Sequence, residues 1–380
     1  MTTLKTKLAA GAATLAASLM ATGAANADAL STPAMTAPLA ANPKPASFDM
    51  LGSKIYVTGQ FTALALFQDN AIPGDKKRRV DLSNAQIEVQ KTDGVFQFYI
   101  QAGAYSLPSL GAGYLKASDT PDLTFHYVPN AYVKIVPSAN FNVEAGILPT
   151  LIGAEYTFTF QNMNIARGLL WNQEPAVSRG VQANFTQGPF SGSFALTDGY
   201  YSGHYATGST LLTYTVSKTD TVAFAGSVPF SKTTKTKFAT PVTLNNGEIF
   251  NLFWTHSQDA WMVEPYLQYG HVPKYLAGGV TDSGSTYGAA VLAKYTVSPV
   301  FSLAGRAEYE GSSGGTSLLY GHKSKAWSLT ATPTVQLNTI FIRGELSYTH
   351  LTDYAPGSGF GKLGDHSSQT RAMIEAGFLF

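Results

Sequence analysis

Hydrophobic and polar residues alternate along most of this chain with a period of two, which is the spacing of side chains on a β-strand. The segment 370–380 shows the pattern from end to end. One of its faces is apolar throughout: Ala372, Ile374, Ala376, Phe378 and Phe380. The opposite face includes two charges: Arg371, Met373, Glu375, Gly377 and Leu379. Repeated along a chain, this alternation indicates strands with lipid on one side and a wet interior on the other.

Alternating runs bounded by turn residues predict about sixteen strands. They are 54–66, 80–90, 95–105, 131–136, 141–147, 179–186, 190–197, 210–216, 221–227, 248–256, 261–271, 287–297, 300–310, 325–336, 339–350 and 370–380. Short turns alternate with long polar loops at 67–79, 106–130, 148–178, 198–209, 228–247, 272–286, 311–324 and 351–369. A soluble β-sandwich does not sort its connections in this way. The expected fold is therefore all-β: a transmembrane antiparallel β-barrel of about 16 strands, with short periplasmic turns and long extracellular loops.

Charged residues are sorted onto one face of the predicted strands. In the run 300–310, Arg306 and Glu308 lie opposite an apolar face. In the run 339–350, Arg343 and Glu345 do the same, although Phe341 interrupts their polar face. A charged side chain facing lipid near the membrane midplane would cost about 2–4 kcal/mol. The sorting therefore predicts which face of each strand looks into the barrel.

The N-terminal region reads as a secretion signal followed by a linker. Lys5 and Lys7 precede a short apolar stretch at 8–20, and Ala25-Asn26-Ala27 forms a small-x-small cleavage site. Residues 28–50 are rich in Ala and Pro. The predicted organisation is a signal peptide at 1–27, an Ala/Pro-rich lead-in at 28–50 and an outer-membrane barrel at 51–380. The expected location is the outer membrane of a Gram-negative bacterium.

Composition supports this reading and excludes several others. Only 13% of the residues are charged and 12% are aromatic, as expected where half of each strand faces lipid. The chain has no cysteine, so no disulfide framework stabilises it. A net charge of +1 gives no bias towards nucleic acid. No metal-ligand spacing, nucleophile elbow or phosphate-binding loop is present, so we expect no enzyme activity and no cofactor.

A barrel of this size leaves an aqueous channel. Charged inward-facing residues, with polar residues of the longest loop, are candidates to line or narrow it: Glu144, Glu155, Asn162, Asn164, Arg167, Glu174, Arg179, Arg306, Glu308, Arg343, Glu345, Arg371 and Glu375. Acids and bases are mixed, which leaves the ion preference open. The alternative for any one of them is pairing with a neighbour across the wall.

The longest loop, 148–178, is too apolar for a solvated connection. It must pack against something, and three partners remain open: the inside of the barrel, the outer mouth, or a neighbouring subunit. If it folds inwards, Glu155, Asn162, Asn164, Arg167 and Glu174 become constriction residues.

The segment from Gly146 to Glu155 ends a predicted strand with a Gly-x-x-x-small-x-x-Gly-x-Glu pattern, and residues 162–168 and 174–181 continue it. This stretch resembles the OmpL-like beta-barrel porin family of Gram-negative outer membranes. The resemblance covers residues 146–197 and implies an outer-membrane channel. The resemblance to sixteen-stranded porins, which commonly form homotrimers, implies a homotrimer as the assembled state. The terminal Phe380 resembles the recognition end that the barrel assembly machinery reads.

The function expected from these observations is a porin that forms a water-filled channel for passive diffusion of small hydrophilic solutes. An alternative is an outer-membrane barrel that serves as scaffold for an adhesin or a hydrolytic enzyme. Expected partners are outer-membrane lipid and lipopolysaccharide, whose phosphates could meet the basic run 76–79 in the first long loop.

Overall fold

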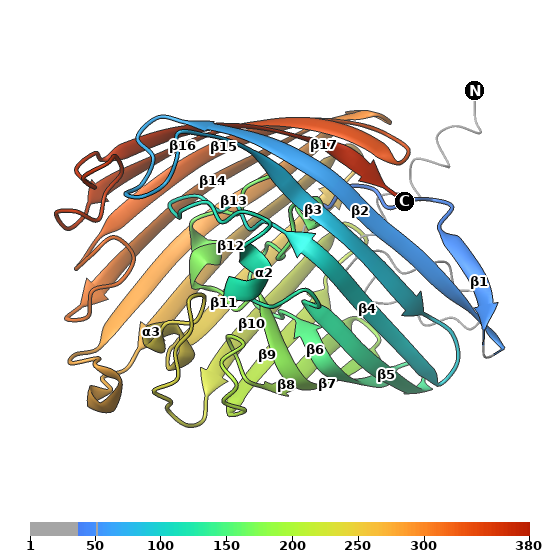
Figure 1. The fold of residues 1–380 in the computed structure, drawn as a ribbon. Helices are drawn as coiled ribbons and strands as arrows, with labels where there is room; N and C mark the ends of the chain where they lie inside the picture. The colour runs from blue at the N-terminus through green and yellow to red at the C-terminus, as the bar shows by residue number, and fades with distance from the viewer. Residues whose placement is uncertain (1–36, 51) are drawn as a thin grey trace.

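The computed structural model describes residues 37–50 and 52–380, which form one antiparallel barrel (Figure 1). The sheet has 17 strands, of which β1 (Ala46–Met50) pairs only with the start of β2. The others close into a ring because β17 pairs with β2. They are β2 (Ser53–Gln68), β3 (Arg78–Lys91), β4 (Phe96–Tyr105), β5 (Asn130–Ser138), β6 (Phe141–Pro149), β7 (Val177–Gln187), β8 (Phe190–Thr197), β9 (Thr207–Thr215), β10 (Asp220–Pro229), β11 (Glu248–Gln258), β12 (Trp261–Val272), β13 (Gly284–Ser298), β14 (Phe301–Gly314), β15 (Lys325–Leu337), β16 (Ile340–Asp353) and β17 (Ser368–Leu379). The predicted 16-strand barrel is confirmed.

The chain's end closes the ring at a tight contact. The register runs from Arg371 opposite Gln68 to Leu379 opposite Gln60. Beyond it, Phe380 and Gly59 exchange two backbone hydrogen bonds of 2.9 Å. The ring of Phe380 lies over Gly59, where an added Cβ would come within 2.4 Å of it. Gly59 therefore leaves room for the terminal aromatic side chain, and closure leaves no free edge between β17 and β2.

Burial alternates along the strands as the sequence predicts. On β17, Arg371, Met373 and Glu375 are buried inside, whereas Ile374 and Phe378 are exposed on the outer wall. Phe341, which broke the polar face of β16, points inwards and is buried in a cluster with Phe158, Phe160 and Leu379. An apolar residue fits this lumen position because a loop of the chain packs against it.

Turn residues separate two kinds of connection, one at each end of the barrel. At one end, short turns use left-handed backbone conformations at Asp259 (φ 52) and Asn338 (φ 51), residue types that tolerate them. We call this the short-turn end; it also holds the C-terminus and β1. The long loops all leave the strands at the other end, the long-loop end; those that follow β12, β14 and β16 lie on the left of Figure 1. Arg78 and Arg79 of the basic run belong to β3, so the first long loop is shorter than predicted.

Helical structure in the described residues is confined to single turns in the loops. These are α2 (Thr120–Leu123), α3 (Val242–Asn245) and the 3₁₀ turns η1 (Thr159–Gln161), η2 (Leu170–Gln173) and η3 (Leu276–Gly278). No helix in this part of the chain is long and apolar enough to cross a membrane.

The predicted signal peptide, 1–27, lies outside the described residues. Of the predicted lead-in, residues 37–50 are described, and they run along the short-turn end. The amide of Leu39 donates to the carbonyl of Phe160 (3.1 Å), and Ala40 exchanges two hydrogen bonds with the side chain of Gln336. This segment therefore contacts both the wall and the chain inside the barrel.

Candidate functional site

The longest loop lies inside the barrel. Every residue from 152 to 170 is buried, although the loop joins adjacent strands, since Pro149 of β6 pairs with Val177 of β7. Phe158 and Phe160 reach a cluster with Leu379 near the short-turn end, whereas Trp171 and Glu174 border a cavity at the long-loop end. Of the three placements that the sequence left open, the structure therefore has the inward one.

Two arginines of the wall hold the loop in place. Arg306 of β14 pairs with Glu155 (2.6 Å) and donates to the carbonyl of Ala166 (2.8 Å). Arg343 of β16 donates to the carbonyls of Thr159 (2.7 Å) and Asn162 (2.9 Å). Both guanidinium groups are fully buried. A guanidinium has five N–H donors and no acceptor, so each can satisfy loop carbonyls and a carboxylate together.

Wall carboxylates accept hydrogen bonds from the backbone of the same loop. Glu345 accepts from the amides of Ile165 (2.5 Å) and Ala166 (3.1 Å). Glu308 accepts from the amide of Leu169 (3.1 Å). Gly168 passes so close to Glu308 that an added Cβ would lie 1.9 Å from its carboxylate. The buried backbone of an irregular loop needs such partners, because unpaired amides and carbonyls are costly away from water.

A second loop, 106–129, joins the first inside the barrel. Ser109 and Arg167 form a parallel bridge, in which the amide of Arg167 donates to Pro108 (3.0 Å) and that of Leu110 to Arg167 (2.9 Å). Arg371 of β17 donates to the carbonyl of Ser109 (2.7 Å). Nothing in the composition of 106–129 indicates this role, because it is the composition of an ordinary loop.

The predicted site residues divide into four groups, the last of which is Arg167 and Glu174. Most of them meet at the interface between loop and wall: Glu155, Arg306, Glu308, Arg343, Glu345, Glu375, and Asn164, which donates to Thr332 (2.8 Å). The side chain of Asn162 instead forms hydrogen bonds within its own loop, with the backbone of Tyr156 and Phe158. Arg371 holds the second loop. Glu144 and Arg179 lie apart: Glu144 pairs with Lys134 on the wall (3.3 Å), and Arg179 pairs with Asp198, the first residue after β8 (2.8 Å).

The side chains of Arg167 and Glu174 are buried, and none of their nitrogen or oxygen atoms has a hydrogen-bond partner among the described residues. The guanidinium of Arg167 lies 5.0 Å from the ring centre of Trp171.

Sequence reasoning missed the hydroxyl groups that complete this interface. Thr159 of the loop donates to Glu375 (2.6 Å), Ser328 to Glu308 (2.7 Å) and Thr332 to Glu345 (3.0 Å). The period-two alternation places Ser328 and Thr332 on the inward face of β15, and that signal could have found them. No comparable signal exists for Thr159, since its position depends on the path of the loop.

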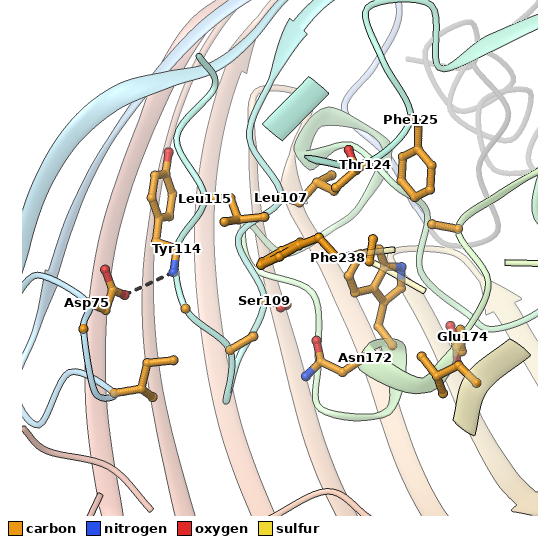
Figure 2. Close-up of a pocket in the computed structure, with 18 of the residues that line it drawn as sticks. Asp75, Leu107, Ser109, Tyr114, Leu115, Thr124, Phe125, Asn172, Glu174 and Phe238 are labelled. Carbon is orange, nitrogen blue, oxygen red and sulfur yellow. Dashed lines mark hydrogen bonds between the residues drawn. The ribbon is translucent and has the colours of Figure 1, made fainter. Parts of the chain in front are cut away.

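A cavity of about 540 Å³ lies between five of the long loops (Figure 2). Its lining includes aromatic side chains from four of these loops: Tyr114, Phe125, Trp171, Tyr200 and Phe238. Asp75 and Glu174 lie at opposite sides of it in Figure 2. No group of three or more His, Asp or Glu side chains in residues 37–50 and 52–380 is placed to hold a metal ion.

The inward placement of the loop predicts a specific crosslink. Because the chain has no cysteine, Asn164→Cys with Thr332→Cys introduces one unique thiol pair. The two side chains touch at 2.8 Å, so we expect dibromobimane, which bridges neighbouring thiols, to become fluorescent on the folded protein. Asn164→Cys with Ser193→Cys, on β8 across the ring, should stay dark. The reverse result would show that the loop does not lie against β15.

Comparisons with known proteins give the same architecture. An anion-selective porin from Comamonas acidovorans is 12% identical, with a TM-score of 0.60 over 86% of this chain and 100% of that one. In-vitro folded OmpT of Vibrio cholerae is 12% identical, with a TM-score of 0.59 over 88% and 99%. The outer-membrane channel DcaP of Acinetobacter baumannii is 10% identical, with a TM-score of 0.57 over 88% and 100%. At these identities the likeness concerns the fold. No curated protein matches the chain.

The family described as "Putative beta-barrel porin-2, OmpL-like" matches residues 54–380, nearly the whole described barrel. The resemblance seen in residues 146–197 is therefore confirmed and extends far beyond them. The protein belongs to this OmpL-like family of outer-membrane β-barrel porins.

Proposed function

We propose that this porin passes small hydrophilic solutes by passive diffusion, along a path narrowed by the loop 150–176. The observation that carries the proposal is the interface inside the barrel, where wall charges at Arg306, Arg343 and Glu345 hold the loop across the lumen. Polar residues beside the loop would border the path, while the outer wall faces lipid. The long-loop end would be extracellular and the short-turn end periplasmic.

Liposome swelling with solutes of graded size tests this proposal. Vesicles containing the folded protein should swell quickly in a pentose and progressively more slowly in a disaccharide and a trisaccharide, because the loop leaves a narrow path. Vesicles that do not swell in the smallest sugar, although the barrel is folded, would contradict it. The alternative of an enzyme or adhesin scaffold predicts that outcome.

A homotrimer also belongs to this proposal. Its support is indirect: one of the similar structures is the trimer form of Vibrio cholerae OmpT, with 11% identity and a TM-score of 0.56. Native mass measurement of the detergent-extracted protein distinguishes a trimer from a monomer. Lipid and lipopolysaccharide would contact the exposed apolar wall and the basic residues near Lys76.

Phe380 would be the residue that the barrel assembly machinery reads. We expect deletion of Phe380 to lower the amount of folded protein in the outer membrane, because it removes both that signal and the ring over Gly59. The molecules that do insert should conduct normally, since Phe380 lies outside the lumen. Phe380→Trp, which keeps an aromatic end, is the control and should assemble better than the deletion. Cell fractionation followed by heat-modifiability on a gel measures the outcome, and equal assembly of both variants would contradict the role.

A further inference from the structure

The cavity at the long-loop end is lined by aromatic and charged side chains. Its volume of about 540 Å³ lies in the range of pockets for small organic molecules, roughly 300–1,000 Å³. Phe238 lies among the lining residues near the middle of Figure 2. Aromatic walls of this kind provide apolar area and attract cations through their ring faces.

The charged lining residues are Asp75, Arg79 and Glu174, and two of them neutralise each other. Asp75 pairs with Arg79 at 2.5 Å and also accepts from the amide of Tyr114 (3.1 Å). Although burial acts against it, hydrogen bonds from Arg79, Tyr114 and Lys76 hold the pKa of Asp75 below its usual value. The Asp75 side of the cavity is therefore internally satisfied.

Glu174 is different. The residue is only 6% exposed, and neither carboxylate oxygen has a hydrogen-bond partner among the described residues. It packs against Gly153, where an added Cβ would lie 1.7 Å from a carboxylate oxygen. The buried indole N–H of Trp171 also lacks a hydrogen-bond partner in this part of the structure. A buried carboxylate without a partner costs free energy, which a ligand that supplies a donor would recover once the side chain turns from Gly153 towards the cavity.

We propose that this cavity binds an organic cation, a solute with an apolar body and one protonated amine, with Glu174 pairing the ammonium group. The aromatic side chains would cover the apolar body. The inference rests on the proposed channel function, because the site would collect such solutes at the mouth of the barrel. Binding itself needs no conduction, so the two can be tested apart.

The surroundings of Glu174 add a pH signature. Burial, reinforced by the carboxylates of Glu155 on the same loop and Glu308 on β14, raises the pKa of Glu174 well above its usual value. Tyr200 and Tyr266 also interact electrostatically with Glu174. Below this raised pKa the carboxyl is protonated, and an ammonium ion must displace the proton to form the pair. Affinity should therefore increase with pH while the amine stays charged, up to roughly pH 9 for a lysine-like amine.

The test is calorimetric titration of the full folded chain in detergent micelles with phenethylammonium, and with the uncharged 2-phenylethanol of similar shape. The wild type should bind the ammonium ion more tightly than the alcohol. Glu174→Gln keeps the shape and removes the charge, so it should weaken ammonium binding by roughly tenfold or more, the effect of losing a charged hydrogen bond. Asp365→Asn, on an exposed loop outside the cavity lining, is the matched control and should bind like the wild type.

Equal affinity of the wild type and Glu174→Gln for phenethylammonium would overturn the proposal, as would equal binding of the alcohol and the ammonium ion by the wild type. The pH series on the wild type needs no variant: affinity that falls or stays constant as the pH rises would also overturn it. Lipid bilayers that contain the protein and show no conductance would contradict the proposed channel. They would not change the result of the binding titration.

Discussion

Replacing residues 152–170 with a short Gly-Ser linker should raise the single-channel conductance several-fold. The segment fills the lumen, and every residue in it is buried. Its removal should leave the wall intact, because Pro149 and Val177 already pair and a tight turn can join β6 to β7. Without the segment, a ring of sixteen strands is wide enough for an aqueous channel.

Planar-bilayer recordings of the shortened and full-length proteins measure the change. Shortening the exposed loop between β12 and β13, across residues 276–279, is the control, because Tyr275 and Val280 already bridge there. That variant should conduct like the wild type. Equal conductance of the 152–170 replacement and the wild type would show that the loop does not limit the current.

Replacing Arg343 with Met should cost about 3–5 kcal/mol of folding free energy, the usual effect of breaking a buried ion pair. Arg343 lies 2.6 Å from Glu375, and both side chains are fully buried. Its loss leaves Glu375 with the hydroxyl of Thr159 and leaves the carbonyls of Thr159 and Asn162 without this donor. The Met side chain fills part of the space that Arg343 occupies. The loss of stability therefore comes from the polar groups that lose their partner and not from a cavity.

Denaturant unfolding of the protein in detergent, followed by tryptophan fluorescence, gives the stability change. The control is Lys325→Met, which breaks an exposed pair with Asp353 at 2.9 Å at the long-loop end. Exposed pairs contribute little, so this variant should unfold close to the wild type. If the two variants unfold at the same denaturant concentration, Arg343 does not anchor the loop as the structure indicates.

The wall of the barrel could be predicted because its pattern is local. A period of two assigns each residue of β14 or β17 to a face without knowledge of any neighbour. The charges at Arg306, Glu308 and Glu375 were found in this way, and the structure places all three inside. The order of the strands followed from the connections, since each short turn forces antiparallel neighbours.

The interior could not be predicted to the same depth. The apolar composition of 148–178 indicated packing, but the inside, the mouth and a neighbouring subunit would bury its Leu and Phe residues equally well. The pairing of Glu155 with Arg306 joins residues far apart in sequence and depends on the path of an irregular loop. The inward position of Phe341 became understandable only with Phe158 and Phe160 beside it. The role of Glu174 could not be predicted either, because its lack of a hydrogen-bond partner depends on loops that meet only in the folded chain.

A planar-bilayer recording of the purified, refolded wild-type protein tests directly whether the barrel forms a channel. We expect discrete conductance steps, small for a barrel of this size because the loop 150–176 lies in the lumen. Folded protein that inserts into the bilayer and never conducts would contradict it.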